Sequence, residues 1–158
     1  MNKYSNLLLK ICIIIILLPV MTVSVIGIIG LFRNPVNPIY AHLLYPIVIG
    51  TYVSSIPFYY CLYLAYKMLD YIDQGRAFST LSTKALDHIK LASFSFSIIY
   101  IILLPFVYFL AQKDDAPGLV IMGIVPIFGA FIIGVFSAVL QHILADAIAI
   151  KSENDLTV

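Results

Sequence analysis

The stretch Ile11–Phe32 reads ICIIIILLPVMTVSVIGIIGLF and contains no Asp, Glu, Lys or Arg. An α-helix rises about 1.5 Å per residue, so about 20 apolar residues cross a hydrocarbon layer of roughly 30 Å. The 22 residues of this stretch are therefore enough to span a bilayer as one helix.

Three further stretches share this lack of charge: Asn34–Tyr66, Leu91–Gln112 and Ala116–Ala145. The chain is 62% hydrophobic and 11% charged, whereas about 25% of the residues in soluble domains are charged. These features predict an all-α integral membrane bundle of four transmembrane helices, forming a single domain over 1–158. The expected helices cover about 8–32, 39–74, 80–112 and 118–150.

The basic residues predict the orientation of the bundle, because short loops rich in Lys and Arg stay in the cytoplasm. Two sit in the loops at one end, namely Arg33 and Lys113. Seven lie toward the other end: Lys3, Lys10, Lys67, Arg76, Lys84, Lys90 and Lys151. We therefore expect a multi-pass plasma-membrane protein with both termini, the loop at about 67–90 and the tail at 151–158 in the cytoplasm. No basic run could neutralise several phosphates, so direct binding of nucleic acid is not expected.

Tyrosines form the first candidate site. Tyr45, Tyr52, Tyr59 and Tyr66 recur every seven residues, which places them on one stripe of a helix. Hydroxyl groups inside the bilayer need hydrogen-bond partners. The candidate cavity for an amphiphilic ligand comprises Tyr52, Tyr59, Tyr63, Thr51 and Ser55. Helix packing with local hydrogen bonds explains the same pattern, so both interpretations stay open.

Small residues form a second pattern, since Ala130, Gly134 and Ala138 recur every four residues in the last apolar stretch. Small side chains at this spacing let two helices approach closely. The pattern predicts a helix-packing seam, either within the monomer or between the copies of a homo-oligomer.

Catalytic and metal-binding patterns do not emerge from the sequence. It contains no serine-hydrolase elbow, phosphate-binding loop or zinc-protease motif. No ionisable Asp, Glu, Lys or Arg falls in the middle of an apolar stretch, which argues against a proton-coupled transporter or ion pump. We therefore expect a protein that is not an enzyme and that uses no cofactor or metal.

The connection between the second and third helices has recognisable ends. Gly75 is typical of a helix C-terminus and Ser79 of an N-cap. After Ser79, apolar side chains recur at helical spacing, at Leu81, Ala85, Leu86 and Ile89. This amphipathic turn could lie at the lipid interface or dock a partner. It could equally be only the start of the third helix.

Two segments carry a resemblance to a known family. The loop pattern Gly75-Arg-Ala-Phe-Ser79, with Leu86 and Ile89 after it, and the closing Lys151-Ser-Glu-Asn-Asp-Leu-Thr-Val158 resemble the domain-of-unknown-function 2975 family of small bacterial membrane proteins. The resemblance extends to chain length and the four-span layout. The chain departs from the family pattern at Ala77 and Leu81.

The resemblance has two implications for partners. Members of this family are often encoded beside a small helix-turn-helix regulator, so such a regulator is an implied cytoplasmic partner. The implied partner-contact surface is formed by residues of the loop and the tail: Phe78, Ser79, Leu86, Glu153, Asn154, Asp155, Leu156 and Thr157.

Two functions remain open from the sequence. The first is a non-enzymatic regulatory or sensory component that acts through its cytoplasmic loop and tail. The second is a binding or transport module for an amphiphilic small molecule within the helices. In both cases membrane lipid surrounds the protein, because so much apolar surface cannot be hidden in a core of this size.

Overall fold

Four long helices make up the computed structural model, which describes residues 3–33 and 38–156, with side chains described for 6–33 and 38–153. They are α1 (Lys3–Arg33), α2 (Ala41–Asp73), α3 (Thr80–Lys113) and α4 (Gly118–Leu156). All four are long and apolar enough to cross a membrane. The prediction of four transmembrane helices is confirmed, and no strand occurs in the described ranges.

Two helices are longer than the sequence suggested. α1 begins at Lys3 instead of near residue 8, and α4 continues to Leu156 instead of ending near residue 150. No Gly or Pro occurs between Gly134 and the end of α4, and the intervening sequence is rich in Ala, Leu and Ile. Nothing in this segment therefore breaks the helix. The predicted tail at 151–158 is helical through Leu156, and its last two residues lie outside the described ranges.

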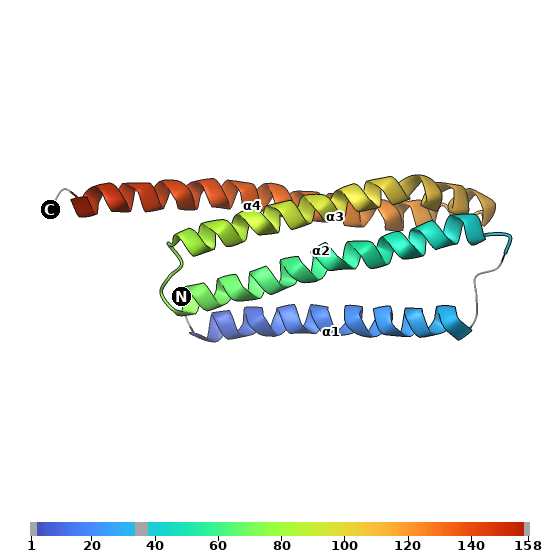
Figure 1. Ribbon diagram of the computed structural model, residues 1–158, viewed down its shortest axis with the longest axis horizontal. Helices are drawn as coiled ribbons and strands as arrows, with labels where there is room; N and C mark the ends of the chain where they lie inside the picture. Colours follow the sequence, from blue (N-terminus) through green and yellow to red (C-terminus); the bar gives the residue numbers. More distant parts are fainter. Residues whose placement is uncertain (1–2, 34–37, 157–158) are drawn as a thin grey trace.

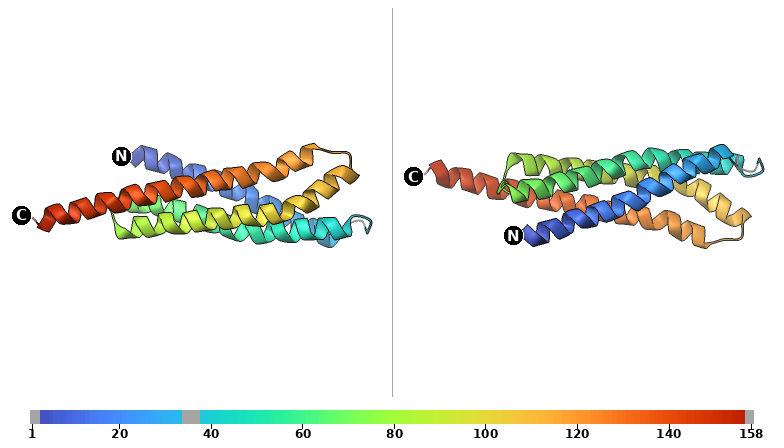
Figure 2. Two further views of the ribbon diagram at one scale, coloured as in Figure 1. Left: turned by 90° about the horizontal axis from the view of Figure 1, so that it is seen from above. Right: turned by 90° about the horizontal axis from the view of Figure 1, so that it is seen from below.

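The helices follow one another in space in the order of the chain (Figure 1). α1 contacts α2, α2 contacts α3 and α3 contacts α4, whereas no contact joins α1 to α3 or α4 within the described residues. The start of α1, the end of α4 and the α2–α3 connection lie at the same end, where α4 projects beyond its neighbours (Figures 1 and 2). The bundle is therefore an open array with α1 and α4 as its edges.

The buried core is small and lies mainly on α3. Most of the buried apolar side chains belong to this helix: Ala85, Leu86, Ile89, Ala92, Leu103 and Ala111. Many large apolar side chains on the outer faces of α1 and α4 are exposed. In water this exposure would be costly, whereas in a bilayer the lipid tails solvate such surfaces.

α1 contacts α2 through one narrow stripe. Its only buried described residue is Asn6, and its half-buried residues recur at alternating steps of three and four along much of the helix: Lys10, Ile13, Leu17, Val20 and Ser24. This spacing is that of a coiled-coil seam. α1 is thus a peripheral helix, held by one face and exposed on all others.

The α2–α3 connection is a tight, hydrogen-bonded turn. Gly75 has a φ of +70°, and the amides of Gly75 and Arg76 donate to the carbonyls of Ile72 and Tyr71, which closes a Schellman motif. The Ser79 hydroxyl accepts from the amide of Ser82 at the start of α3. The buried Ser82 hydroxyl in turn donates to the Arg76 carbonyl at 3.1 Å. These bonds fix the short loop against both helices.

Candidate functional site

A cavity of about 570 Å³ lies on α2 between α1 and α3. Thr51, Tyr52 and Ser55, three residues of the predicted cavity, line it. α1 contributes Ser24 and Gly27 among other residues, and α3 contributes Phe96 and Tyr100. No charged residue of the described ranges lines the cavity, so its polar groups there are hydroxyls and backbone.

Tyr59 and Tyr63, the other two predicted residues, face a different space. They line a separate cavity of about 250 Å³ between α1 and α2, together with Leu17 and Tyr66. Tyr63 is also 56% exposed. The predicted stripe of tyrosines is therefore divided between two spaces.

The Tyr52 hydroxyl connects α1 to α2. It donates a hydrogen bond of 2.9 Å to the Ser24 carbonyl, and the Ser24 hydroxyl lies 3.5 Å from the Tyr59 hydroxyl. A Cβ atom on Gly27 would lie only 2.7 Å from the Tyr52 hydroxyl oxygen. Gly27 thus provides the space into which this tyrosine reaches. Sequence reasoning missed Ser24, which is one of two residues with hydroxyl side chains in the apolar stretch Ile11–Phe32, the other being Thr22.

Aromatic rings close the cavity on the α3 side. The Phe58 and Phe96 rings have centroids 6.1 Å apart, and Phe96 stacks on Tyr100 at 4.7 Å. Phe58 and Phe96 also line a second cavity of about 370 Å³ between α2, α3 and α4. The two rings therefore separate two apolar spaces on opposite sides of the α2–α3 contact.

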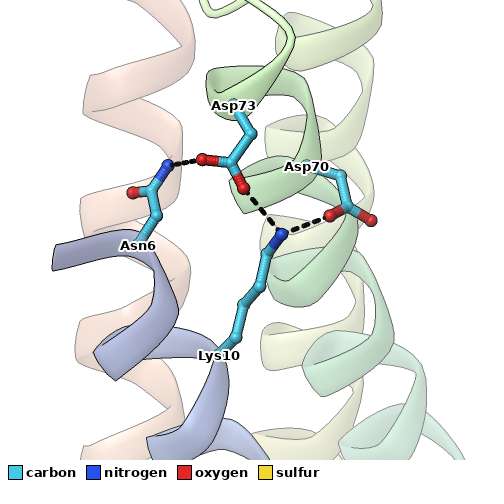
Figure 3. Close-up of polar contacts among 4 residues, drawn as sticks. All are labelled: Asn6, Lys10, Asp70 and Asp73. Atoms are coloured by element: carbon cyan, nitrogen blue, oxygen red, sulfur yellow. Dashed lines mark hydrogen bonds and ion pairs between the residues drawn. The ribbon is translucent and has the colours of Figure 1, made fainter. Parts of the chain in front are cut away.

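A polar cluster, which we call the Lys10 cluster, joins the first turns of α1 to the last turn of α2 through Asn6, Lys10, Asp70 and Asp73 (Figure 3). The Lys10 Nζ atom lies 2.5 Å from Oδ1 of Asp70 and 2.7 Å from Oδ2 of Asp73. The side-chain amide of Asn6 donates to the other oxygen of Asp73 at 2.5 Å. Asn6 is only 2% exposed. This cluster was not predicted, although antiparallel helices joined by a short loop bring the two ends of the hairpin together.

The predicted partner-contact surface is only partly available. Phe78 is 66% exposed, whereas Ser79 is occupied as the N-cap of α3. The expectation for Leu86 is wrong, because its side chain is 4% exposed within the core. Of the apolar residues that recur after Ser79, Ala85, Leu86 and Ile89 form the buried face of α3, whereas Leu81 is 45% exposed. The alternative interpretation, that this turn is the start of the third helix, therefore holds for the buried three.

The tail residues of the predicted surface lie at the end of α4. Glu153 is exposed, and the backbone of Asn154, Asp155 and Leu156 is helical. The side chains of these last three residues, and Thr157 altogether, lie outside the described residues. The helical backbone nevertheless means that this segment leaves the bundle as a continuation of α4.

The small-residue seam of α4 faces α3. A Cβ atom on Gly134 would lie 3.0 to 3.2 Å from the Phe94 ring, and Ala130 lines the second cavity. Ala138 is half-buried on the same side of the helix. The Ser97 hydroxyl adds a 2.9 Å hydrogen bond to the Ile127 carbonyl. The contact at Gly134 is thus made within one chain.

Comparison with known proteins agrees with the membrane fold. The chain is 43% identical, over the full length of both proteins, to the uncharacterized membrane protein YoaS of Bacillus subtilis (strain 168). No solved structure gives a significant match. Residues 31–158, which include α2, α3 and α4, match the family described as protein of unknown function (DUF2975). The resemblance of the loop and tail is thereby confirmed, and this chain is a multi-pass membrane protein that belongs to the DUF2975 family.

Proposed function

We propose that this protein is a non-enzymatic membrane protein that binds an amphiphilic small molecule in the cavity between α1, α2 and α3. One observation carries the proposal. Hydroxyl groups and aromatic rings from three helices face a single space of about 570 Å³. Ligand pockets of about 300–1,000 Å³ with mostly apolar walls and a few polar groups are typical of small-molecule sites.

The packing of α1 supports entry of a ligand from the bilayer. α1 touches α2 along one stripe and has no contact with α3 in the described ranges. The cavity wall is therefore not sealed by helix contacts between α1 and α3. A molecule dissolved in lipid can reach such a site without crossing an aqueous phase.

Filling the cavity is expected to abolish retention of the ligand. Thr51→Phe places a ring in the space, whereas Thr22→Phe places the same ring on the exposed face of α1. The two threonines are matched, since each donates to the carbonyl four residues earlier, at 2.7 and 2.8 Å. We expect mass spectrometry of molecules that copurify with the protein to show about a tenfold loss, about 1.4 kcal/mol, for Thr51→Phe only. Equal retention by both variants and the wild type would contradict the proposal.

We further propose that the protein resides in the plasma membrane with both termini and the α2–α3 loop in the cytoplasm. The support is the excess of Lys and Arg at that end, seven residues against two. This orientation puts the Lys10 cluster on the cytoplasmic side.

A second candidate function is a regulatory or sensory role through the cytoplasmic end, with a small helix-turn-helix regulator as partner. The observation that favours it is the exposed Phe78 ring on a loop held by the Gly75 and Ser79 hydrogen bonds. A fixed apolar side chain outside the bundle is a suitable anchor for a protein partner.

A photo-crosslinker at Phe78 tests this second candidate in the native host. We expect one soluble protein to be trapped there, and Phe78→Ala to reduce its recovery at least several-fold. A crosslinker at Phe128, which is exposed on the outer face of α4 within its apolar span, serves as control. Trapping of lipid alone at Phe78 would overturn the regulatory role.

A further inference from the structure

We infer that the cavity between α1, α2 and α3 selects an apolar molecule whose polar end is a neutral hydroxyl group. The inference rests on the proposed binding function and deepens it by naming the chemistry of the ligand. Three features carry it: the use of the hydroxyl protons around the cavity, the unused hydroxyl of Tyr100, and the lack of charge.

Most hydroxyl protons around the cavity are already engaged. Tyr52 donates to the Ser24 carbonyl at 2.9 Å, and the serine and threonine hydroxyls donate to carbonyls of their own helices. These bonds run from Thr51 to Ile47 at 2.7 Å, from Ser54 to Thr51 at 2.8 Å, from Ser55 to Tyr52 at 2.6 Å and from Ser24 to Val20 at 2.8 Å. A hydroxyl that donates its proton keeps lone pairs that accept. The wall of α1 and α2 is therefore a set of acceptors.

Tyr100, on the α3 wall, offers a hydrogen-bond donor instead of an acceptor. Its ring is half-buried, stacks on Phe96 and lines the cavity from α3. Its hydroxyl makes no hydrogen bond to any residue that the structure describes. A half-buried phenol in an apolar space normally finds a partner. Tyr100 is thus a hydrogen-bond donor with no partner among the described residues.

A ligand hydroxyl matches both walls, because it accepts from Tyr100 and donates to an oxygen on α1 or α2. An ether or ester oxygen can accept only, and an ammonium can donate only. A carboxylate or phosphate would bring a negative charge into a cavity that no Lys, Arg or His of the described chain lines, and an unpaired charge is costly at this depth in a membrane. The other wall residues, such as Val20, Val48 and Phe58, suit a hydrocarbon body.

Three probes with one hydrocarbon chain test the inference: hexadecanol, its methyl ether and hexadecanoic acid at a pH where it is ionised. The full chain in detergent micelles is titrated with each probe, and bound probe is counted by native mass spectrometry. We expect the alcohol to bind about tenfold more tightly than the ether and the acid, since each neutral hydrogen bond contributes about 0.5–1.5 kcal/mol.

Two sets of variants test separately the hydrogen bond that Tyr100 donates to the ligand and the one that the ligand donates to the opposite wall. Tyr100→Phe should weaken the binding of the alcohol and of the ether by about fivefold each. The melting temperature should not change, because the substitution removes no hydrogen bond within the described residues. The double variant Thr51→Val and Ser55→Ala should weaken the binding of the alcohol only, because it removes acceptor oxygens from the α2 wall. Tyr45→Phe and Thr22→Val lie outside the cavity and should leave all affinities unchanged.

The possible outcomes distinguish failure of the proposed binding function from failure of the preference for a hydroxyl group. If no probe binds, or if Thr51→Phe leaves binding intact, the proposed function itself fails. If the three probes bind equally and Thr51→Phe removes them all, the cavity binds ligands but the preference for a hydroxyl is overturned. Tighter binding of the acid would also overturn it.

Discussion

Gly50→Leu is expected to destabilise the protein by about 3 kcal/mol, because it forces α2 away from α3. A Cβ atom at Gly50 would lie 2.9 Å from Cγ of Leu103 and closer still to both of its methyl groups. Leu103 is buried, so its side chain cannot turn away into lipid. The free energy of unfolding, measured by denaturant titration in mixed micelles, should fall accordingly.

Gly30→Leu is the matched control for this prediction. No atom of the described residues lies within 4 Å of a Cβ atom at Gly30, which is on the exposed surface of α1. It should change the free energy of unfolding by no more than about 0.5 kcal/mol. The double variant Gly50→Leu and Leu103→Ala should lose less free energy of unfolding than the two single variants lose together, since alanine at 103 leaves room for the new leucine. Equal stability of the Gly50 and Gly30 variants would show that α2 and α3 do not meet at this point.

The Gly50 contact also bears on the candidate site. Ile47, Val48, Thr51 and Tyr52 line the cavity within one turn of Gly50. A shift of α2 relative to α3 therefore changes the distance between the walls that carry Thr51 and Tyr100. We therefore expect the Gly50→Leu variant to retain less ligand as well as to be less stable.

Lys10→Met is expected to loosen α1 from α2. The substitution leaves the carboxylates of Asp70 and Asp73 next to each other without the ammonium that now lies 2.5 and 2.7 Å from them. The Lys10 side chain is only 18% exposed, and like charges in a partly dehydrated site repel each other. Hydrogen exchange of the α1 amides should become faster, and the apparent melting temperature should fall by several degrees Celsius.

Two comparisons make this prediction specific. Lys10→Arg keeps the positive charge and can bond to both carboxylates, so it should retain most of the protection from exchange. Lys84→Met removes an exposed lysine from the start of α3 and should have no such effect. Unchanged exchange in α1 after Lys10→Met would mean that the Tyr52 and Ser24 contact alone holds the helix.

The Lys10 cluster has a consequence for access to the cavity. α1 is attached to α2 at the polar cluster near its start and at Ser24 farther along, where the Tyr52 hydroxyl donates to the backbone carbonyl and the Tyr59 hydroxyl lies 3.5 Å from the side-chain hydroxyl. Between these two attachments, apolar residues of α1 such as Ile13 and Leu17 face α2. Loosening one attachment lets the helix pivot on the other. Ligand retention should therefore be lower in Lys10→Met than in Lys10→Arg.

The number and kind of the helices follow directly from the amino-acid sequence. A run such as Ile11–Phe32 can satisfy its backbone in lipid only as a helix, whatever surrounds it. The helix ends at Gly75 and Ser79 were equally predictable, because a positive φ and an N-cap depend on local residues. The family resemblance rested on the same short segments.

The grouping of residues into sites depended on the tertiary structure. Periodicity places Tyr52, Tyr59 and Tyr63 on or near one stripe, but the position of α1 across that stripe separates Tyr52 from the other two. Leu86 belonged to an amphipathic face whose partner was unknown, and Leu86 proved to lie in the core together with Ala85 and Ile89. The pairing of Lys10 with Asp70 and Asp73 joins residues 60 or more positions apart. Local spacing defines the faces of a helix, whereas the faces that meet are decided by how the helices pack against one another.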